Sequence, residues 1–154
     1  QLKLLNVPLV YFGVIHAFLT GAEILVVNNF KMFEKLLSKK TYLMLSAIVT
    51  GGFLILLGLN DSIILTVISI VIVAGFGLTR PVLFQSYYNK YIESNNRATV
   101  ISTISMINRI SRAIVYPLVG LMVNWSLAFS FVIIGSVIIL LTLISSVKEE
   151  HLTD

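Results

Sequence analysis

The chain has 154 residues and a formal net charge of +4, and 57% of its residues are hydrophobic while only 12% are charged. This composition, with a mean hydropathy of +0.97, is too apolar for an ordinary soluble domain and indicates a membrane protein. The absence of cysteine excludes disulfides, thiolate nucleophiles and cysteine-ligated metal sites. The basic residues flank hydrophobic segments and form no basic face, so nucleic acid is not an expected partner.

A helix needs roughly 20 apolar residues to cross the hydrocarbon core of a bilayer. The sequence contains five such stretches and predicts spans at residues 7–27, 42–59, 63–86, 98–123 and 125–147. These runs are continuous and lack the strict alternation over about ten residues that marks a barrel strand. The predicted fold is therefore an all-α, polytopic transmembrane helix bundle.

The links between the predicted spans differ in charge. Those at residues 28–41 and 87–97 carry the lysines and arginines, whereas those at residues 60–62 and at Asn124 carry none. Because basic residues concentrate in cytoplasmic loops, we expect a multi-pass protein of the cell membrane with its N-terminal end outside and its C-terminal tail in the cytoplasm. The odd number of spans and a first residue, Gln1, that is not methionine lead us to expect a fragment of a longer protein.

Few ionisable side chains fall within the predicted spans, namely His16, Glu23, Arg80, Arg109 and Arg112. Charged groups inside a membrane are costly and normally face a protein interior or a water-filled cavity. The first, third and fourth spans are therefore expected to line a cavity. The second and fifth spans carry no charge and are expected to face lipid.

In the first span, a polar stripe follows steps of three and four residues, which place its members on one helical face. Its members are Gly13, His16, Thr20, Glu23 and Val27. The pattern favours a face that lines a cavity. The alternative is a packing face, in which His16 and Thr20 bond to backbone carbonyls and Glu23 is a neutral core residue.

In the fourth span, a longer stripe contains Ser102, Ser105, Arg109, Arg112 and Tyr116. Arg109 lies roughly 18 Å along the helix from its inner end and Arg112 roughly 22 Å, too deep for both to reach the inner surface. An arginine at the bilayer centre costs about 2.5–3.5 kcal/mol on insertion scales. The two arginines are therefore expected to contact water, an acid or a substrate. The alternative for either residue is a structural role, in which its side chain bonds one helix to another.

Proline and glycine predict irregular points in two spans. Pro81 predicts a kink or break near the inner end of the third span, where Arg80 is expected to extend to the interface. Pro117 and Gly120 predict a second kink in the outer half of the fourth span.

The sequence holds no pattern typical of catalysis. It has no P-loop, GxGxxG, HExxH or GxSxG motif. The two histidines lie far apart and the carboxylates are scattered, so neither a metal site nor an acid–base pair is expected. We expect a protein that is not an enzyme and that needs no cofactor.

One segment resembles a known family. The stretch "YYNKYIESNNRATVISTISMINRISRAIVYPLVGLMVN", at residues 87–124, is similar to the junction of the tenth and eleventh helices of major facilitator superfamily transporters, above all in "RATVIS" and "PLVG". The stretch "FEKLLSKK", at residues 33–40, resembles a weak copy of the basic loop between helices eight and nine, without its glycine and aspartate. The resemblance implies that residues 1–154 are a partial C-terminal transmembrane domain, helices eight to twelve, and that the N-terminal half is absent.

The resemblance also implies a secondary transporter that moves a small solute by alternating access. Its partners would be a small-molecule substrate, protons, the lipid bilayer and the missing N-terminal half. Proton-coupled efflux of amphipathic compounds is the first expectation; uptake of an organic anion and a non-transporting docking subunit are the alternatives. The expected substrate pathway consists of Arg109, Arg112, Ser105, Tyr116 and Thr20. Glu23 and His16 are the candidates for proton coupling, because carboxyl and imidazole groups exchange protons.

Overall fold

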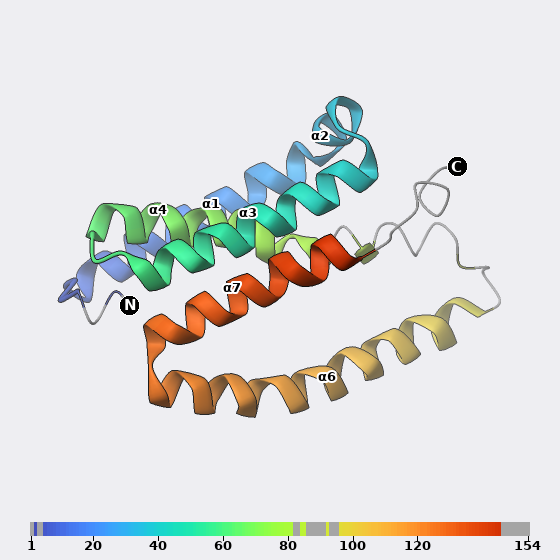
Figure 1. The fold of residues 1–154 in the computed structure, drawn as a ribbon. Coiled ribbons are helices and arrows are strands. Elements are labelled where there is room, and N and C mark those ends of the chain that lie inside the picture. Colours follow the sequence, from blue (N-terminus) through green and yellow to red (C-terminus); the bar gives the residue numbers. More distant parts are fainter. Residues whose placement is uncertain (1, 3–4, 82–83, 86–91, 93–95, 146–154) are drawn as a thin grey trace.

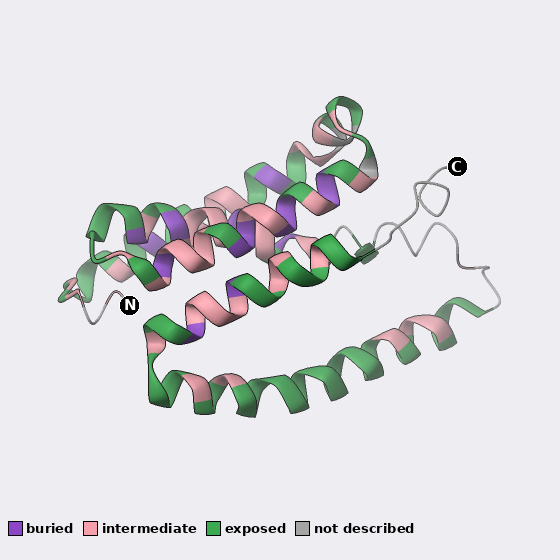
Figure 2. Ribbon diagram, in the orientation of Figure 1, coloured by how far each residue is buried: buried purple, intermediate pink, exposed green. Residues whose placement is uncertain are grey.

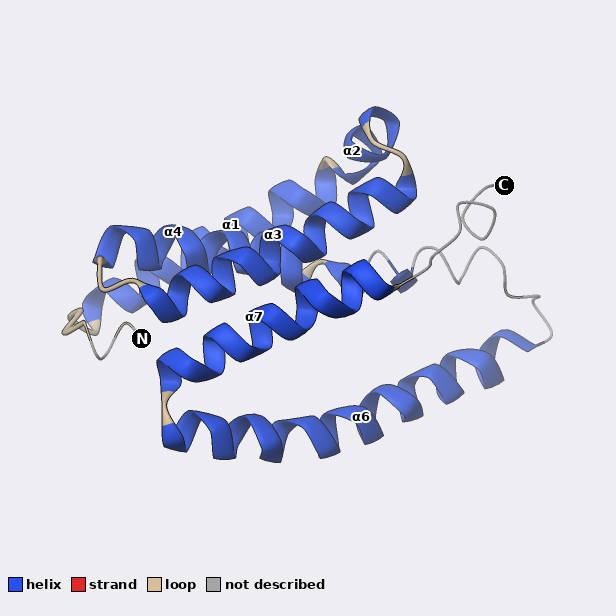
Figure 3. Ribbon diagram, in the orientation of Figure 1, coloured by secondary structure: helices blue, strands red, loops and turns tan. Residues whose placement is uncertain are grey.

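A computed structural model of the chain describes residues 2, 5–81, 84–85, 92 and 96–145. All regular elements in these residues are helical (Figure 3), which confirms the all-α prediction. In chain order they are α1 (Val10–Asn28), α2 (Phe30–Leu36), α3 (Lys39–Leu59), α4 (Ile63–Val73), the π-helix η1 (Ala74–Leu78), α6 (Arg97–Trp125) and α7 (Leu127–Ile144).

Four of these helices are long and apolar enough to cross a membrane, namely α1, α3, α6 and α7. The predicted span at residues 63–86 corresponds to a shorter apolar helix, Ile63–Leu78, which ends in a turn at Thr79. Residues 82–83 and 86 of that predicted span lie outside the described residues, and so do residues 146–147 of the span predicted at residues 125–147. The long apolar helices are consistent with a membrane-embedded, helical protein.

Side-chain caps fix several helix boundaries. The Ser38 hydroxyl accepts a hydrogen bond from the backbone N–H of Thr41 at 3.3 Å, and the Ser126 hydroxyl accepts one from that of Phe129 at 3.3 Å. These bonds satisfy N–H groups that have no partner within the first turns of α3 and α7. The side-chain oxygen of Asn60 accepts from the backbone N–H two residues later at 3.0 Å, which stabilises the turn between α3 and α4.

The helices run lengthwise beside one another, so that their connections gather at two ends (Figure 1). The turn between α3 and α4, the start of α1 and the turn between α6 and α7 lie at one end. The lysine-bearing α2 and the end of α7 lie at the other. The two links without lysine or arginine are thus on the same side of the bundle, opposite α2, as the predicted alternation of spans requires.

The interior is built mainly from small side chains. The buried positions with small side chains include Ser46, Ala47, Thr50, Thr66, Ser69, Ala74 and Ser130. Glycines bring α3 and α7 together: a Cβ added to Gly51 would lie 2.8 Å from the carbonyl oxygen of Gly135, and one added to Gly58 would meet that of Ala128. Small residues of this kind allow the backbones of membrane helices to approach closely.

Helix α6 lies at the edge of the bundle. Its 29 residues include none that is buried, and Figure 2 shows it exposed along most of its length. It packs against α7, with which it shares the turn at Ser126, and the two helices diverge away from that turn (Figure 1).

Burial within the described helices does not test the expected division into cavity-lining and lipid-facing helices, which stays a prediction. Helix α3, expected to face lipid, supplies more buried side chains than any other described helix, whereas α6, expected to line a cavity, supplies none. Charge therefore does not indicate which helix lies at the centre of the described bundle. Packing instead follows the small residues of α3, which carry no charge and which let neighbouring helices approach.

Candidate functional site

The polar stripe of the fourth predicted span lies on α6. Ser102, Ser105, Arg109, Arg112 and Tyr116 are all exposed, and Tyr116 exposes 66% of its surface. The helix is continuous from Arg97 to Trp125, so the spacing of the stripe places these side chains on a single face. The two guanidinium groups belong to the middle of a helix that is long enough to cross a bilayer.

Neither arginine is neutralised within the described part of the chain. Arg109 and Arg112 form no hydrogen bond or ion pair with any described residue. A guanidinium group in the hydrocarbon core is tolerated when it meets water, an anion or another polar surface. The stripe therefore needs something to cover it.

The stripe on α1 also faces away from the packed bundle. Ile15 and Val26, on another face of α1, are buried, and a Cβ added to Gly75 of η1 would lie 3.4 Å from the Val26 side chain. By contrast, His16 and Thr20 are exposed and Glu23 is half-buried. Packing of α1 on η1 thus leaves His16 exposed and covers Glu23 only in part.

The structure does not join the two stripes through an ion pair. In the residues described, Glu23 forms no salt bridge with Arg109 or Arg112. The described structure therefore offers no partner for Glu23 on α6. The cavity between them remains a prediction.

The two predicted kinks lie in segments of different helical geometry. Pro117 and Gly120 lie within the continuous helix α6, and their kink remains a prediction. Before Pro81, the chain forms the π-helix η1 and a turn, in which the Thr79 hydroxyl donates a hydrogen bond to the Gly75 carbonyl oxygen at 2.6 Å. Such π-helical turns are often found at functional sites.

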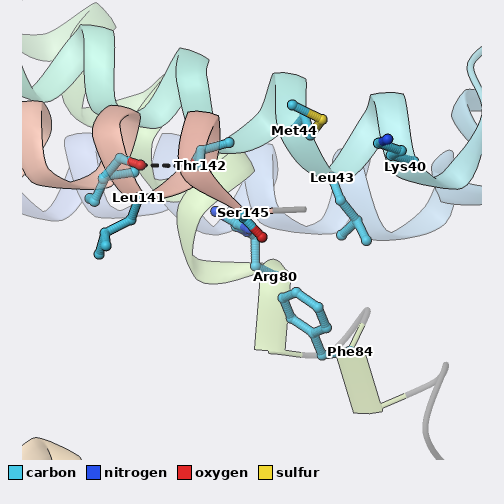
Figure 4. A pocket seen from close by; sticks show the side chains of 9 residues that line it. Lys40, Leu43, Met44, Arg80, Phe84, Leu141, Thr142 and Ser145 are labelled. Carbon is cyan, nitrogen blue, oxygen red and sulfur yellow. Dashed lines mark hydrogen bonds between the residues drawn. The ribbon is translucent and has the colours of Figure 1, made fainter. Parts of the chain in front are cut away.

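A basic pocket lies between the start of α3, the segment after η1 and the end of α7 (Figure 4). Its volume is about 350 Å³, and the charged residues among its described lining are Lys40 and Arg80. From the sequence alone, Lys40 is one charge of a basic link and Arg80 a side chain that extends to the interface. No spacing pattern links them, because they come from different helices.

No group of three or more histidine, aspartate or glutamate residues in the described part of the chain could hold a metal ion. In comparisons with known proteins, no family model, no curated protein and no solved structure matches the chain. The likeness to major facilitator superfamily transporters therefore rests on the two quoted sequence segments.

Proposed function

We propose that the protein is part of a secondary transporter of the major facilitator type and that its helices correspond to helices eight to twelve. The observation that carries this proposal is the exposed stripe of α6, with Arg109 and Arg112 in the middle of a 29-residue helix. At about 2.5–3.5 kcal/mol for each arginine in lipid, a hydrated solute pathway is the better environment. Alternating access around a site near the bilayer midplane supplies such a pathway.

The opposite wall of this pathway would be the N-terminal half of the same transporter. Both α1 and α6 present polar faces that the described bundle does not cover. A second helical half placed over them would enclose the stripe residues in one cavity. Arg109, Arg112, Ser105, Tyr116 and Thr20 would then contact the solute.

Proton coupling is assigned to Glu23 and His16. Both groups lie on the open face of α1, and intramembrane carboxyl and histidine groups form proton relays in transporters. Efflux of amphipathic compounds is the first choice of activity, since proton-coupled exporters are common in the family that the sequence resembles.

The test is solute flux in proteoliposomes that contain the full-length protein, with an imposed pH gradient and a panel of amphipathic and anionic solutes. Glu23→Gln should abolish gradient-driven flux of the transported solute. Asp61→Asn, which removes an acid from the exposed turn between α3 and α4, should leave flux unchanged. Equal flux in wild type and Glu23→Gln would remove Glu23 from the coupling mechanism.

Two alternatives would give different results. If the protein takes up an organic anion, Arg109→Ala and Arg112→Ala should each abolish anion binding while the protein stays folded; normal binding in both would exclude that activity. If the protein is a docking subunit, no solute should be transported, and the exposed face of α6 should bind a partner helix through its polar side chains.

A further inference from the structure

The basic pocket has walls of two kinds. On α3, Lys40, Leu43 and Met44 follow the spacing of one helical face, and on α7 the residues at positions 138, 141, 142 and 145 do the same. Figure 4 shows the Arg80 side chain beside Ser145, at the end of α7. The pocket thus combines an apolar groove between two packed helices with charged groups from α3 and from the segment after η1.

Both charged lining residues are cations. Lys40 and Arg80 are half-buried, and among the described residues no carboxylate lines the pocket. Neither residue forms an ion pair with a described residue. The guanidinium carbon of Arg80 lies 5.8 Å from the centre of the Phe84 ring, a contact that orients the group without neutralising it. The pocket therefore carries two positive charges that an anion can compensate.

The position of the pocket along the membrane-spanning helices indicates which anion it binds. Lys40 is the first residue of a candidate membrane span, and Ser145 directly follows the last residue of α7. The charges thus lie where the helices leave the apolar layer, which is the level of lipid headgroups. Leu43, Ile138 and Leu141 continue the lining with apolar side chains, in the direction in which an acyl chain would extend.

We infer that this pocket binds an anionic phospholipid, with its phosphate between Arg80 and Lys40 and an acyl chain along the groove between α3 and α7. Arginine forms paired hydrogen bonds with phosphate oxygens, and lysine adds a point charge. Basic pockets between membrane helices bind anionic headgroups in this manner. The inference does not depend on transport, because none of these residues belongs to the stripes of α1 or α6.

The test is native mass spectrometry of the full-length protein in detergent, with equal amounts of phosphatidylglycerol and phosphatidylcholine that carry the same acyl chains. Since each basic side chain near an anionic lipid strengthens binding about fivefold, the wild type should prefer phosphatidylglycerol about 25-fold. Arg80→Gln and Lys40→Gln should each lower this preference about fivefold. The matched control is Lys35→Gln, which removes an exposed lysine of α2 at the same end of the bundle, outside the pocket, and should change nothing.

Two further measurements separate a lipid from a soluble phosphate and from a loss of folding. Glycerol 3-phosphate in excess should leave the bound lipid in place; displacement of the lipid would assign the pocket to soluble phosphates and overturn the lipid assignment. Arg80→Lys should keep most of the preference and the helical circular dichroism of the wild type. Equal retention of both lipids by the wild type, or an equal loss in Lys35→Gln, would also overturn the proposal.

Discussion

Gly51 and Gly135 face each other across the contact between α3 and α7, where a Cβ added to Gly135 would lie 2.5 Å from the carbonyl oxygen of Gly51. Because the obstacle is backbone, it cannot rotate away as a side chain can. The two helices can remain this close only while both positions lack a side chain.

Gly135→Ala is therefore expected to destabilise the protein by about 1–3 kcal/mol, the usual cost of overpacking. Thermal unfolding in detergent, followed by circular dichroism, would measure the loss. Gly52→Ala is the control, since an added Cβ there meets nothing within 4 Å and alanine is the better helix former. A Gly135→Ala protein as stable as Gly52→Ala would contradict the close contact.

Thr66→Val is expected to leave stability unchanged or to raise it. The Thr66 hydroxyl is fully buried and has no hydrogen-bond partner in the described structure, so removing it relieves a desolvation cost. Thr50→Val should instead lower the free energy of unfolding by about 0.5–1 kcal/mol, because the Thr50 hydroxyl donates to the Ser46 carbonyl oxygen at 2.7 Å. Equilibrium unfolding of both variants would reveal the difference, and an equal loss in both would refute it.

Ser105→Cys should react faster with a water-soluble thiol reagent than Ile114→Cys in the reconstituted full-length protein. The two positions lie on opposite faces of α6, and only the polar face is expected to contact water, where the reactive thiolate forms. The 154 residues contain no cysteine that would add background labelling. Similar rates at both positions would show that α6 has no hydrated face.

Ser62→Cys should be labelled in intact cells by a reagent that cannot cross the membrane, whereas Lys35→Cys should be labelled only after the cells are opened. This follows from the predicted cytoplasmic position of the lysine-bearing link. Both positions are exposed, so burial does not distort the comparison. The reverse pattern would invert the predicted orientation.

The apolar runs predicted the long helices well, because helix length in a membrane is set by bilayer thickness. The predicted span at residues 42–59 begins three residues late: the Ser38 cap starts α3 at Lys39, among charged residues that the apolar window left out. The short helix α2 was not predicted, since its seven residues were interpreted only as a basic link. The rings of Phe30 and Phe33 pack on Tyr42, each with its ring centre 5.7 Å away.

The candidate sites were predictable to different degrees. The stripe on α6 belongs to one helix, so the spacing of Arg109 and Arg112 suffices to place both on one face. In the basic pocket, Lys40 and Arg80 line one cavity only because several elements pack together. That packing depends on glycine contacts such as the one between Gly51 and Gly135, which charge and hydropathy do not reveal.

The buried and half-buried hydroxyl groups affect how the bundle can move. The hydrogen bonds described for Ser46, Thr50, Thr79, Ser130 and Thr142 all end on carbonyl oxygens of the same helical segment. Sliding these helices past one another would break none of those bonds, so resistance to shear comes from the interlocking of side chains. At Gly51 and Gly135 an added Cβ would meet backbone, whereas one added to Gly75 of η1 would lie no closer than 3.4 Å to α1. Sliding of α1 on η1 would therefore cost less than sliding of α3 on α7.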